Sequence, residues 1–273
     1  MTKGNLNPVL DTIYSHSSVR HFTEDDVNRN DEKTIVEAGQ RASTSCNMQP
    51  YSFISIRNPE TRRKIAGISK GAAMAASAPL ILMVCVDQYR LEKVAEKAGV
   101  AYYKSEFLDN FMLSVADASL AAQNAALAAE SLGYGICYLG SIRAEMKLLR
   151  ELLSLPQRVF PLFAIAIGVP EKKNSQKPRL PIEGVWFQEK YDTIAAEKAV
   201  DEYNRQMVAT GIYDGRHFTL EACMIRNDAD KPEESDDGYG WIDHTARRIS
   251  STNAADIRPE MKKNLEEAGF GFK

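Results

Sequence analysis

The stretch from Leu113 to Leu132 constrains the fold more than any other part of this sequence. It contains no proline and no glycine, and alanine makes up much of it, so its intrinsic helix propensity is high. Gly133 predicts the end of the helix, because glycine readily adopts the left-handed conformation that follows a helix C-terminus. Asp117 and Glu130 are its only charged residues, so the helix lacks a solvated face. We therefore expect it to be buried, either in the middle of a domain or between two subunits.

An apolar segment follows this helix and ends in small residues. Residues 135–143 read GICYLGSIR, which predicts a short strand whose end lets a ligand approach the backbone. Gly135 and Gly140 have the spacing of a phosphate-binding P-loop, but Ser141 stands where that motif requires lysine. A dinucleotide-binding glycine fingerprint is excluded as well, because the spacing differs and these glycines follow a helix instead of a strand.

Length and composition are those of an ordinary globular protein. The chain has 273 residues, of which 44% are hydrophobic and 26% charged, enough for one large domain or two small ones. A net charge of −3, without basic runs, gives no support for nucleic-acid binding. The longest apolar run, near residues 79–86, is far shorter than the about 20 residues of a membrane span, and the histidine spacing predicts no metal site.

Cysteine usage predicts the compartment. The four cysteines are scattered, without a C-x-x-C pair, at Cys46, Cys85, Cys137 and Cys223. With no signal peptide at the N-terminus, we expect them to be reduced thiols in a cytoplasmic protein.

Helices and strands interleave along the rest of the chain. Asn7 and Pro8 predict the cap and first turn of a helix, with Leu10, Ile13 and Tyr14 on its inner face. Further helices are expected over about 31–42, 88–110, 144–153, 194–209 and 259–269, and strands over 51–57, 79–86 and 160–169.

This order of elements predicts an α+β or three-layer fold. We expect a single domain over residues 1–273, with a mobile excursion at about 211–240 and a helix near the C-terminus.

Three polar segments are candidates for ligand binding. Residues 16–22, HSSVRHF, concentrate donors that suit a phosphate or a flavin pyrimidine edge, although a capped, solvated loop is the commoner explanation of such a composition. Residues 41–50, RASTSCNMQP, equally suit a structured connector, because hydroxyl and amide side chains satisfy turn backbones. Lys177 and Arg179 flank Pro178 in a basic loop, which is either solvated or a clamp on an anionic ligand.

Four motifs, in this order, resemble the FMN-dependent nitroreductase family, and within it the larger NADPH-type nitroreductases and flavin reductases. The motifs are HSSVRHF, RASTSCNMQP, AAESLGYGICYLGSIR and KPRLP, and they span roughly residues 9–210. The resemblance implies an α+β sheet flanked by helices, in an intertwined homodimer. It also implies that the long helix lies at the interface and that two FMN sites lie between the subunits.

The resemblance further implies which residues hold FMN. The phosphate and ribityl groups would be held from the first and last motifs, and Arg20 would lie at the pyrimidine edge, where a fixed cation favours the reduced flavin. The backbone N–H of Gly140 or Ser141 would point at the reactive flavin nitrogen, and the second motif would come from the partner subunit. The implied cofactor-binding set is His16, Ser17, Ser18, Arg20, Ser45, Asn47, Gln49, Tyr138, Leu139, Gly140, Ser141, Lys177 and Arg179.

The implied activity is a ping-pong oxidoreduction. NADPH or NADH would deliver hydride to FMN and leave before a nitroaromatic, a quinone or a flavin is reduced. Because the flavin carries the chemistry, no catalytic side chain is expected. Two alternatives stay open, namely a flavin-binding redox sensor or storage module, and the same fold using reduced FMN on a dedicated metabolite.

Overall fold

The computed structural model describes residues 7–172, 174–216 and 239–273. They form two compact units, the first being Met1–Ser175 with Glu260–Lys273 and the second being Gln176–Pro259. The expected mobile excursion at 211–240 falls mostly on residues 217–238, which lie outside the described residues. The single domain stays a prediction, because two compact units of one chain can belong to one domain.

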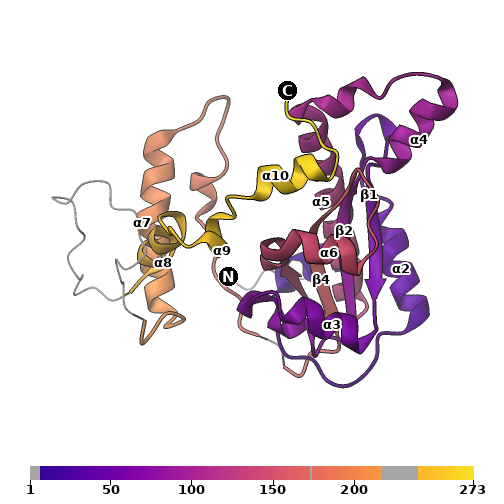
Figure 1. Ribbon diagram of the computed structural model, residues 1–273. Helices are drawn as coiled ribbons and strands as arrows, with labels where there is room; N and C mark the ends of the chain where they lie inside the picture. Colours follow the sequence, from indigo (N-terminus) through magenta and orange to yellow (C-terminus); the bar gives the residue numbers. More distant parts are fainter. Residues whose placement is uncertain (1–6, 173, 217–238) are drawn as a thin grey trace. The chain divides into compact units, whose positions relative to one another are not determined.

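A four-stranded antiparallel sheet forms the centre of the first unit (Figure 1). Its strands, in spatial order, are β1 (Tyr51–Ile56), β2 (Leu80–Asp87), β4 (Val159–Gly168) and β3 (Gly135–Leu139). Every residue of β2 is buried, as its continuous apolar sequence predicts. Because side chains alternate along a strand, Leu82 and Val84 join the core on one face of the sheet and Met83 joins the core on the other. The sheet is therefore the middle of three layers, which confirms the α+β prediction.

Helices α2 (Arg29–Gly39) and α5 (Leu108–Ser131) cover one face of this sheet (Figure 1). Helix α5 begins before the expected Leu113, and Gly133, with φ of +90°, follows its end as predicted. The alanines of α5 that pack against the sheet and α2 are all buried: Ala118, Ala121, Ala122, Ala125, Ala126 and Ala129. Small side chains let the backbones of these elements approach closely.

Helix α5 is not buried on every side within the single chain, so of the two expected settings, burial in the middle of a domain is not complete and burial between two subunits stays a prediction. Met112, Ala116 and Leu120, four residues apart, form an exposed apolar stripe, in which Met112 is 60% and Leu120 is 50% exposed. The lack of charged residues correctly indicated that the surface of α5 is apolar. The chain itself, however, does not cover the side of α5 that carries this stripe. Even so, no helix in the described ranges combines the length and apolarity needed to cross a membrane.

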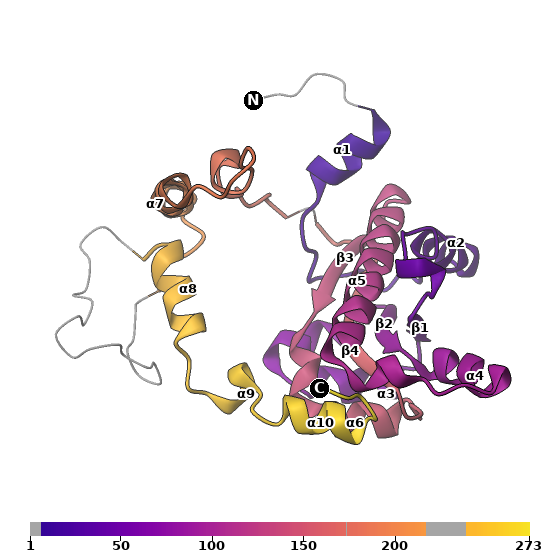
Figure 2. The same cartoon turned by 90° about the horizontal axis from the view of Figure 1, so that it is seen from above.

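Helix α1 (Pro8–Ser15) is also less buried than expected. Its cap is confirmed, because the Asn7 side chain accepts a hydrogen bond from the N–H of Leu10 at 3.0 Å. Leu10, Ile13 and Tyr14 are exposed, however, and α1 has no buried residue. Figure 2 shows α1 projecting beyond the sheet, so its apolar side does not face the core of its own chain.

The other face of the sheet carries the shorter helices. They are α3 (Pro59–Ala66), α6 (Met146–Leu152) and α10 (Met261–Glu267), with the 3₁₀ turns η2 (Lys70–Ala75) and η4 (Ser141–Glu145). The strand expected over 135–143 ends at Leu139, where η4 takes over. The helix expected over 88–110 is interrupted, because Gly99 adopts a φ of +69° and ends α4 (Tyr89–Ala98) before the short turn η3 (Tyr103–Glu106).

The second unit has a small core of its own. Its elements are η5 (Ile182–Gly184), α7 (Thr193–Ala209), α8 (Trp241–Ile249) and α9 (Ala254–Ile257). Tyr203 and Met207 of α7 pack with Tyr213, and the Trp241 ring meets the Tyr203 ring at 5.1 Å. The helix expected over 194–209 is thus confirmed within one residue.

The close packing of α2 on α5 predicts that Gly39→Ala destabilises the protein. A Cβ at Gly39 would lie 3.0 Å from the Ala121 carbonyl oxygen and 3.1 Å from the Phe53 ring. We expect overpacking to lower the free energy of unfolding by about 1–3 kcal/mol. Denaturant unfolding measures it, with Gly67→Ala as the matched control.

Gly67 follows α3 with φ of −70°, and a Cβ there would meet nothing closer than 3.5 Å. Alanine at 67 should therefore be neutral or stabilise by about 0.4–1 kcal/mol through the unfolded state. Equal stability of the two variants would contradict tight packing at Gly39.

Candidate functional site

Residues 16–22 run alongside β3, on the side opposite β4. The N–H of Val19 donates to the carbonyl of Ile136 at 2.8 Å, and Phe22 pairs with Pro170 in an antiparallel bridge. A Cβ at Gly135 would lie 2.6 Å from the Val19 side chain, so glycine is needed for this approach. Val19 therefore lies beside Gly135 and Ile136 at the start of β3, and the chain continues from there to the segment after β4. The first and third sequence motifs are thus brought together within one chain.

His16 is held by a partner on α5. It lies at the C-terminal end of α1, and its Nδ1 is 2.6 Å from Oε1 of Glu130. Burial raises the pKa of the Glu130 carboxyl, while the hydrogen bond and charge of His16 act in the opposite direction. The other oxygen, Oε2, is buried and has no partner among the described residues. This contact leaves Nε2 of His16 as the ring nitrogen directed away from α5.

The rest of the segment presents donors that the described protein does not use. Arg20 is exposed, and neither its guanidinium nor the hydroxyls of Ser17 and Ser18 bond to any residue in the described ranges. The backbone of this segment is held in place, because the Asn174 side chain donates a hydrogen bond to the carbonyl of Ser18 at 2.7 Å. Burial raises the pKa of the Cys137 thiol, and the nearby charge of Arg20 opposes that shift.

The end of β3 combines a partly open aromatic ring with small residues. The Tyr138 ring packs edge-on against Phe163 at 5.4 Å, and its hydroxyl donates to Oε1 of Gln123 at 3.4 Å. Leu139 belongs to the core. Gly140 caps η4 and Ser141 is its first residue, so their backbone N–H groups have no partner inside that turn. The Ser141 hydroxyl is buried without a hydrogen-bond partner in the described structure.

The second motif forms a loop that is tied to α5 at Asp117. This carboxylate is 2% exposed and accepts hydrogen bonds from the Thr44 hydroxyl at 2.5 Å and from the Ser45 N–H at 3.0 Å. The turn η1 (Ser45–Asn47) follows, and the Gln49 side chain donates to Oδ1 of Asn47 at 3.2 Å.

The loop 44–49 has an unusual backbone. Cys46, Asn47 and Gln49 have φ values of +49°, +55° and +54°, a region that residues other than glycine rarely adopt. Arg90 donates to the carbonyl of Gln49 at 3.0 Å and so fixes the far side of the loop. Asn47 and Gln49 remain exposed.

Within one chain the two groups of predicted residues stay apart. Asp117 and Glu130, which anchor them, are separated by 13 positions on α5, which corresponds to about 20 Å along a helix. The structure therefore gathers the residues around His16 and Tyr138 in one place and those around Ser45 in another.

Lys177 and Arg179 belong to the second unit and are described within it. Nη1 of Arg179 donates to the carbonyl of Lys177 at 3.0 Å, and the Tyr203 hydroxyl donates to that of Pro178 at 3.0 Å. These contacts fix the backbone between the two cationic side chains, both of which belong to exposed residues.

The sequence reasoning missed the residues that hold the site in place. Glu130, Asp117, Asn174 and Gln123 were not predicted to contact the motifs. A signal existed for the first two, because a charge in an otherwise uncharged, buried helix requires a partner. No group of three His, Cys, Asp or Glu residues in the described part of the chain could hold a metal ion.

Comparisons with known proteins agree on one family. The profile of the nitroreductase family matches residues 13–169, and that of its C-terminal domain matches residues 177–219. An NADPH-dependent oxidoreductase of Staphylococcus saprophyticus is 39% identical over 265 residues, which cover 96% of this chain and 97% of that protein. An FMN reductase (NADPH) of Bacillus subtilis is 38% identical over 190 residues, or 68% of this chain and 76% of the relative.

The fold is shared with a solved structure as well. The NfrA1 nitroreductase from B. subtilis superposes with a TM-score of 0.80 at 30% identity, covering 96% of this chain and 98% of that one.

The setting of Tyr138 predicts a phenol that stays neutral throughout the physiological pH range. Burial, and to a smaller extent the Glu130 charge, raises its pKa from 10.0 to about 12. A difference titration of tyrosinate absorbance, wild type minus Tyr138→Phe, should show one phenol ionising near that pH. Glu130→Gln should lower this pKa but leave it above 10.0, because burial is the larger cause. Ionisation at the ordinary tyrosine value would show that the phenol is freely solvated.

Proposed function

This chain belongs to the nitroreductase family, and we propose that it is an FMN-dependent NAD(P)H oxidoreductase that reduces nitroaromatics, quinones or flavins in a ping-pong reaction. The observation that carries this proposal is the contact of Val19 with Ile136, which brings the unused donors of residues 16–20 next to β3, the strand that ends in Gly140 and Ser141. The relatives named as an FMN reductase (NADPH) and an NADPH-dependent oxidoreductase support the same pair of cofactors.

The residues present fit FMN. Residues 17–20 offer donors that the described protein does not use, and the buried Ser141 hydroxyl and Oε2 of Glu130 are polar atoms for which it supplies no partner. Bound FMN would supply the hydride chemistry, taking two electrons from NAD(P)H and passing them to the second substrate.

In this proposal, the residues of the chain bind FMN and place a positive charge beside its ring. The unpaired Arg20 guanidinium lies beside β3, where it would stabilise negative charge at the pyrimidine edge. The N–H groups of Gly140 and Ser141 would donate to the ring, and the absence of a large side chain at either position lets it come close. No side chain is needed as a nucleophile, so we propose that protons come from water.

We propose that two of the sequence motifs supply the donors and the positive charge that bind the FMN phosphate. His16, oriented by Glu130, and the hydroxyls of Ser17 and Ser18 supply donors from the first unit. Lys177 and Arg179 are the proposed source of positive charge for the phosphate, and the backbone between them is fixed at Pro178.

We propose that the complete site requires a homodimer. The exposed apolar sides of α1 and α5 lack a cover in the single chain, and such surfaces are typical of subunit interfaces. The separation of about 20 Å between Asp117 and Glu130 along α5 also supports Ser45, Asn47 and Gln49 coming from the partner subunit.

The proposed compartment is the cytoplasm. The described cysteines Cys46, Cys85 and Cys137 are free thiols, and the last two are buried, which suits a reducing environment.

Purified protein should show flavin absorbance that bleaches when NADPH or NADH is added without oxygen, and the faster nucleotide identifies the preferred donor. In Arg20→Ala, bleaching should be slower by on the order of tenfold or more, because a charge aimed at the reduced ring is lost. Arg63→Ala, which removes an exposed guanidinium on α3, should bleach at the wild-type rate. Protein that takes up no FMN, or Arg20→Ala that binds FMN and bleaches at full speed, would contradict the proposal.

An aspartate on the exposed side of α1 should separate the subunits. Ile13→Asp places a charge on a surface that we propose is buried in the dimer, so light scattering should show a larger monomer fraction and FMN should bind more weakly. Val94→Asp is the matched control, because Val94 is an exposed apolar residue on α4. A monomeric wild type with FMN bound would refute the two-subunit site.

A further inference from the structure

A cavity of about 340 Å³ opens between α6 and α10 in the first unit. None of the predicted cofactor-binding residues lines it. Its volume lies at the low end of the about 300–1,000 Å³ that is usual for small-molecule sites. The cavity therefore suits a ligand much smaller than a flavin or a nicotinamide dinucleotide.

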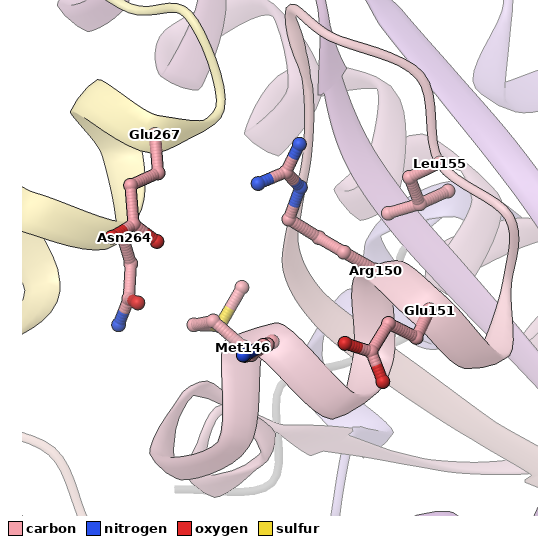
Figure 3. Close-up of a pocket in the computed structure, with 7 residues that line it drawn as sticks. Met146, Arg150, Glu151, Leu155, Asn264 and Glu267 are labelled. Atoms are coloured by element: carbon pink, nitrogen blue, oxygen red, sulfur yellow. The ribbon is translucent and has the colours of Figure 1, made fainter.

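Arg150 is the residue that makes this cavity unusual. Figure 3 shows its guanidinium reaching from α6 into the space in front of α10. Its Nε is buried without a hydrogen-bond partner, and the guanidinium forms no ion pair with any residue in the described ranges. A buried N–H of a charged group that lacks an acceptor is costly, so an acceptor from outside the chain would satisfy it. A planar carboxylate matches the fork geometry of arginine.

The opposite wall supplies groups of the other kind. Asn264 and Glu267 project from α10 towards the cavity (Figure 3). Neither side chain bonds to another residue of the described structure. Glu267 can accept from a cationic nitrogen, and the Asn264 amide can both donate and accept.

Apolar and balancing charged groups complete the lining. Met146 is 1% exposed and, with the half-buried Leu155, gives the cavity an apolar side. Lys147 and Glu151 lie at exposed positions of the lining and carry opposite charges. The charges around the cavity therefore cancel, so a simple anion would meet two carboxylates and a simple cation would meet an arginine and a lysine.

We propose that this cavity binds a small zwitterion of the amino-acid type, with its carboxylate on Arg150, its ammonium group towards Glu267 and an apolar side chain against Met146 and Leu155. The carboxylate meets the buried, unpartnered Nε of Arg150, the ammonium group meets the exposed Glu267 carboxylate, and the side chain meets apolar residues. The proposal does not rest on the flavin chemistry, because the cavity has lining residues of its own.

Isothermal titration of the purified full-length protein with three matched probes tests this. The probes are L-leucine, 4-methylpentanoate, which lacks the ammonium group, and 3-methylbutylamine, which lacks the carboxylate. Leucine should bind saturably, and each of the other two at least tenfold more weakly. Arg150→Gln and Glu267→Gln should each weaken leucine binding tenfold or more. Lys263→Gln, an exposed change on α10 outside the cavity lining, should leave leucine binding unchanged.

The variants also report which end of the ligand each residue meets. Arg150→Gln should abolish the residual binding of 4-methylpentanoate, while Glu267→Gln should leave it unchanged or strengthen it, because a repelling carboxylate is removed. Arg150→Lys keeps the positive charge but removes the paired N–H groups of the guanidinium, so it should also weaken leucine binding. It serves as the second variant if Arg150→Gln misfolds. No saturable leucine binding, or binding by both Arg150 variants equal to wild type, would overturn the proposal. Equal binding of leucine and 4-methylpentanoate would overturn the zwitterion assignment.

Discussion

The close approach of α5 to α2 and to the sheet is the constraint on which the first unit depends. A face made of alanine lets the helix lie against its neighbours at backbone distance, and this burial places Asp117 and Glu130 in surroundings where a charge needs partners. Asp117 finds them in the loop 44–49, and Glu130 finds one in His16. One helix therefore determines where both halves of the candidate site are attached.

The sequence predicted the helices and strands of the first unit better than it predicted the contacts that their side chains make. The long helix, the left-handed Gly133 and the fully buried β2 follow from local signals, namely propensity, a glycine stop and an unbroken apolar run. The partners of the polar motifs do not follow in this way. His16 and Glu130 are 114 positions apart, and Ser18 and Asn174 are 156 apart, so no local pattern contains them. The burial of the apolar sides of α1 and α5 could not be predicted for a related reason. An apolar pattern shows that a surface tends to be covered, but it does not show which part of the protein covers it.

Backbone strain is concentrated in the loop 44–49. Left-handed conformations at residues other than glycine cost of order 1–3 kcal/mol each, and three of them occur between Cys46 and Gln49. They persist because Asp117 holds the start of the loop and Arg90 holds its end. A loop fixed at both ends presents Asn47 and Gln49 to the outside in a defined geometry, which suits side chains that must meet a ligand bound mainly elsewhere.

The contact between Val19 and Ile136 also bears on aggregation. In the order β1-β2-β4-β3, β3 is an edge strand, and its outer row of backbone groups could template pairing with another molecule. The segment around Val19 occupies part of that row, so the residues proposed to grip the cofactor also shield a sheet edge. Local unfolding of this segment would loosen the cofactor and uncover an aggregation-prone strand in the same event. On the proposed site, we therefore expect loss of flavin and loss of solubility to be coupled in this protein.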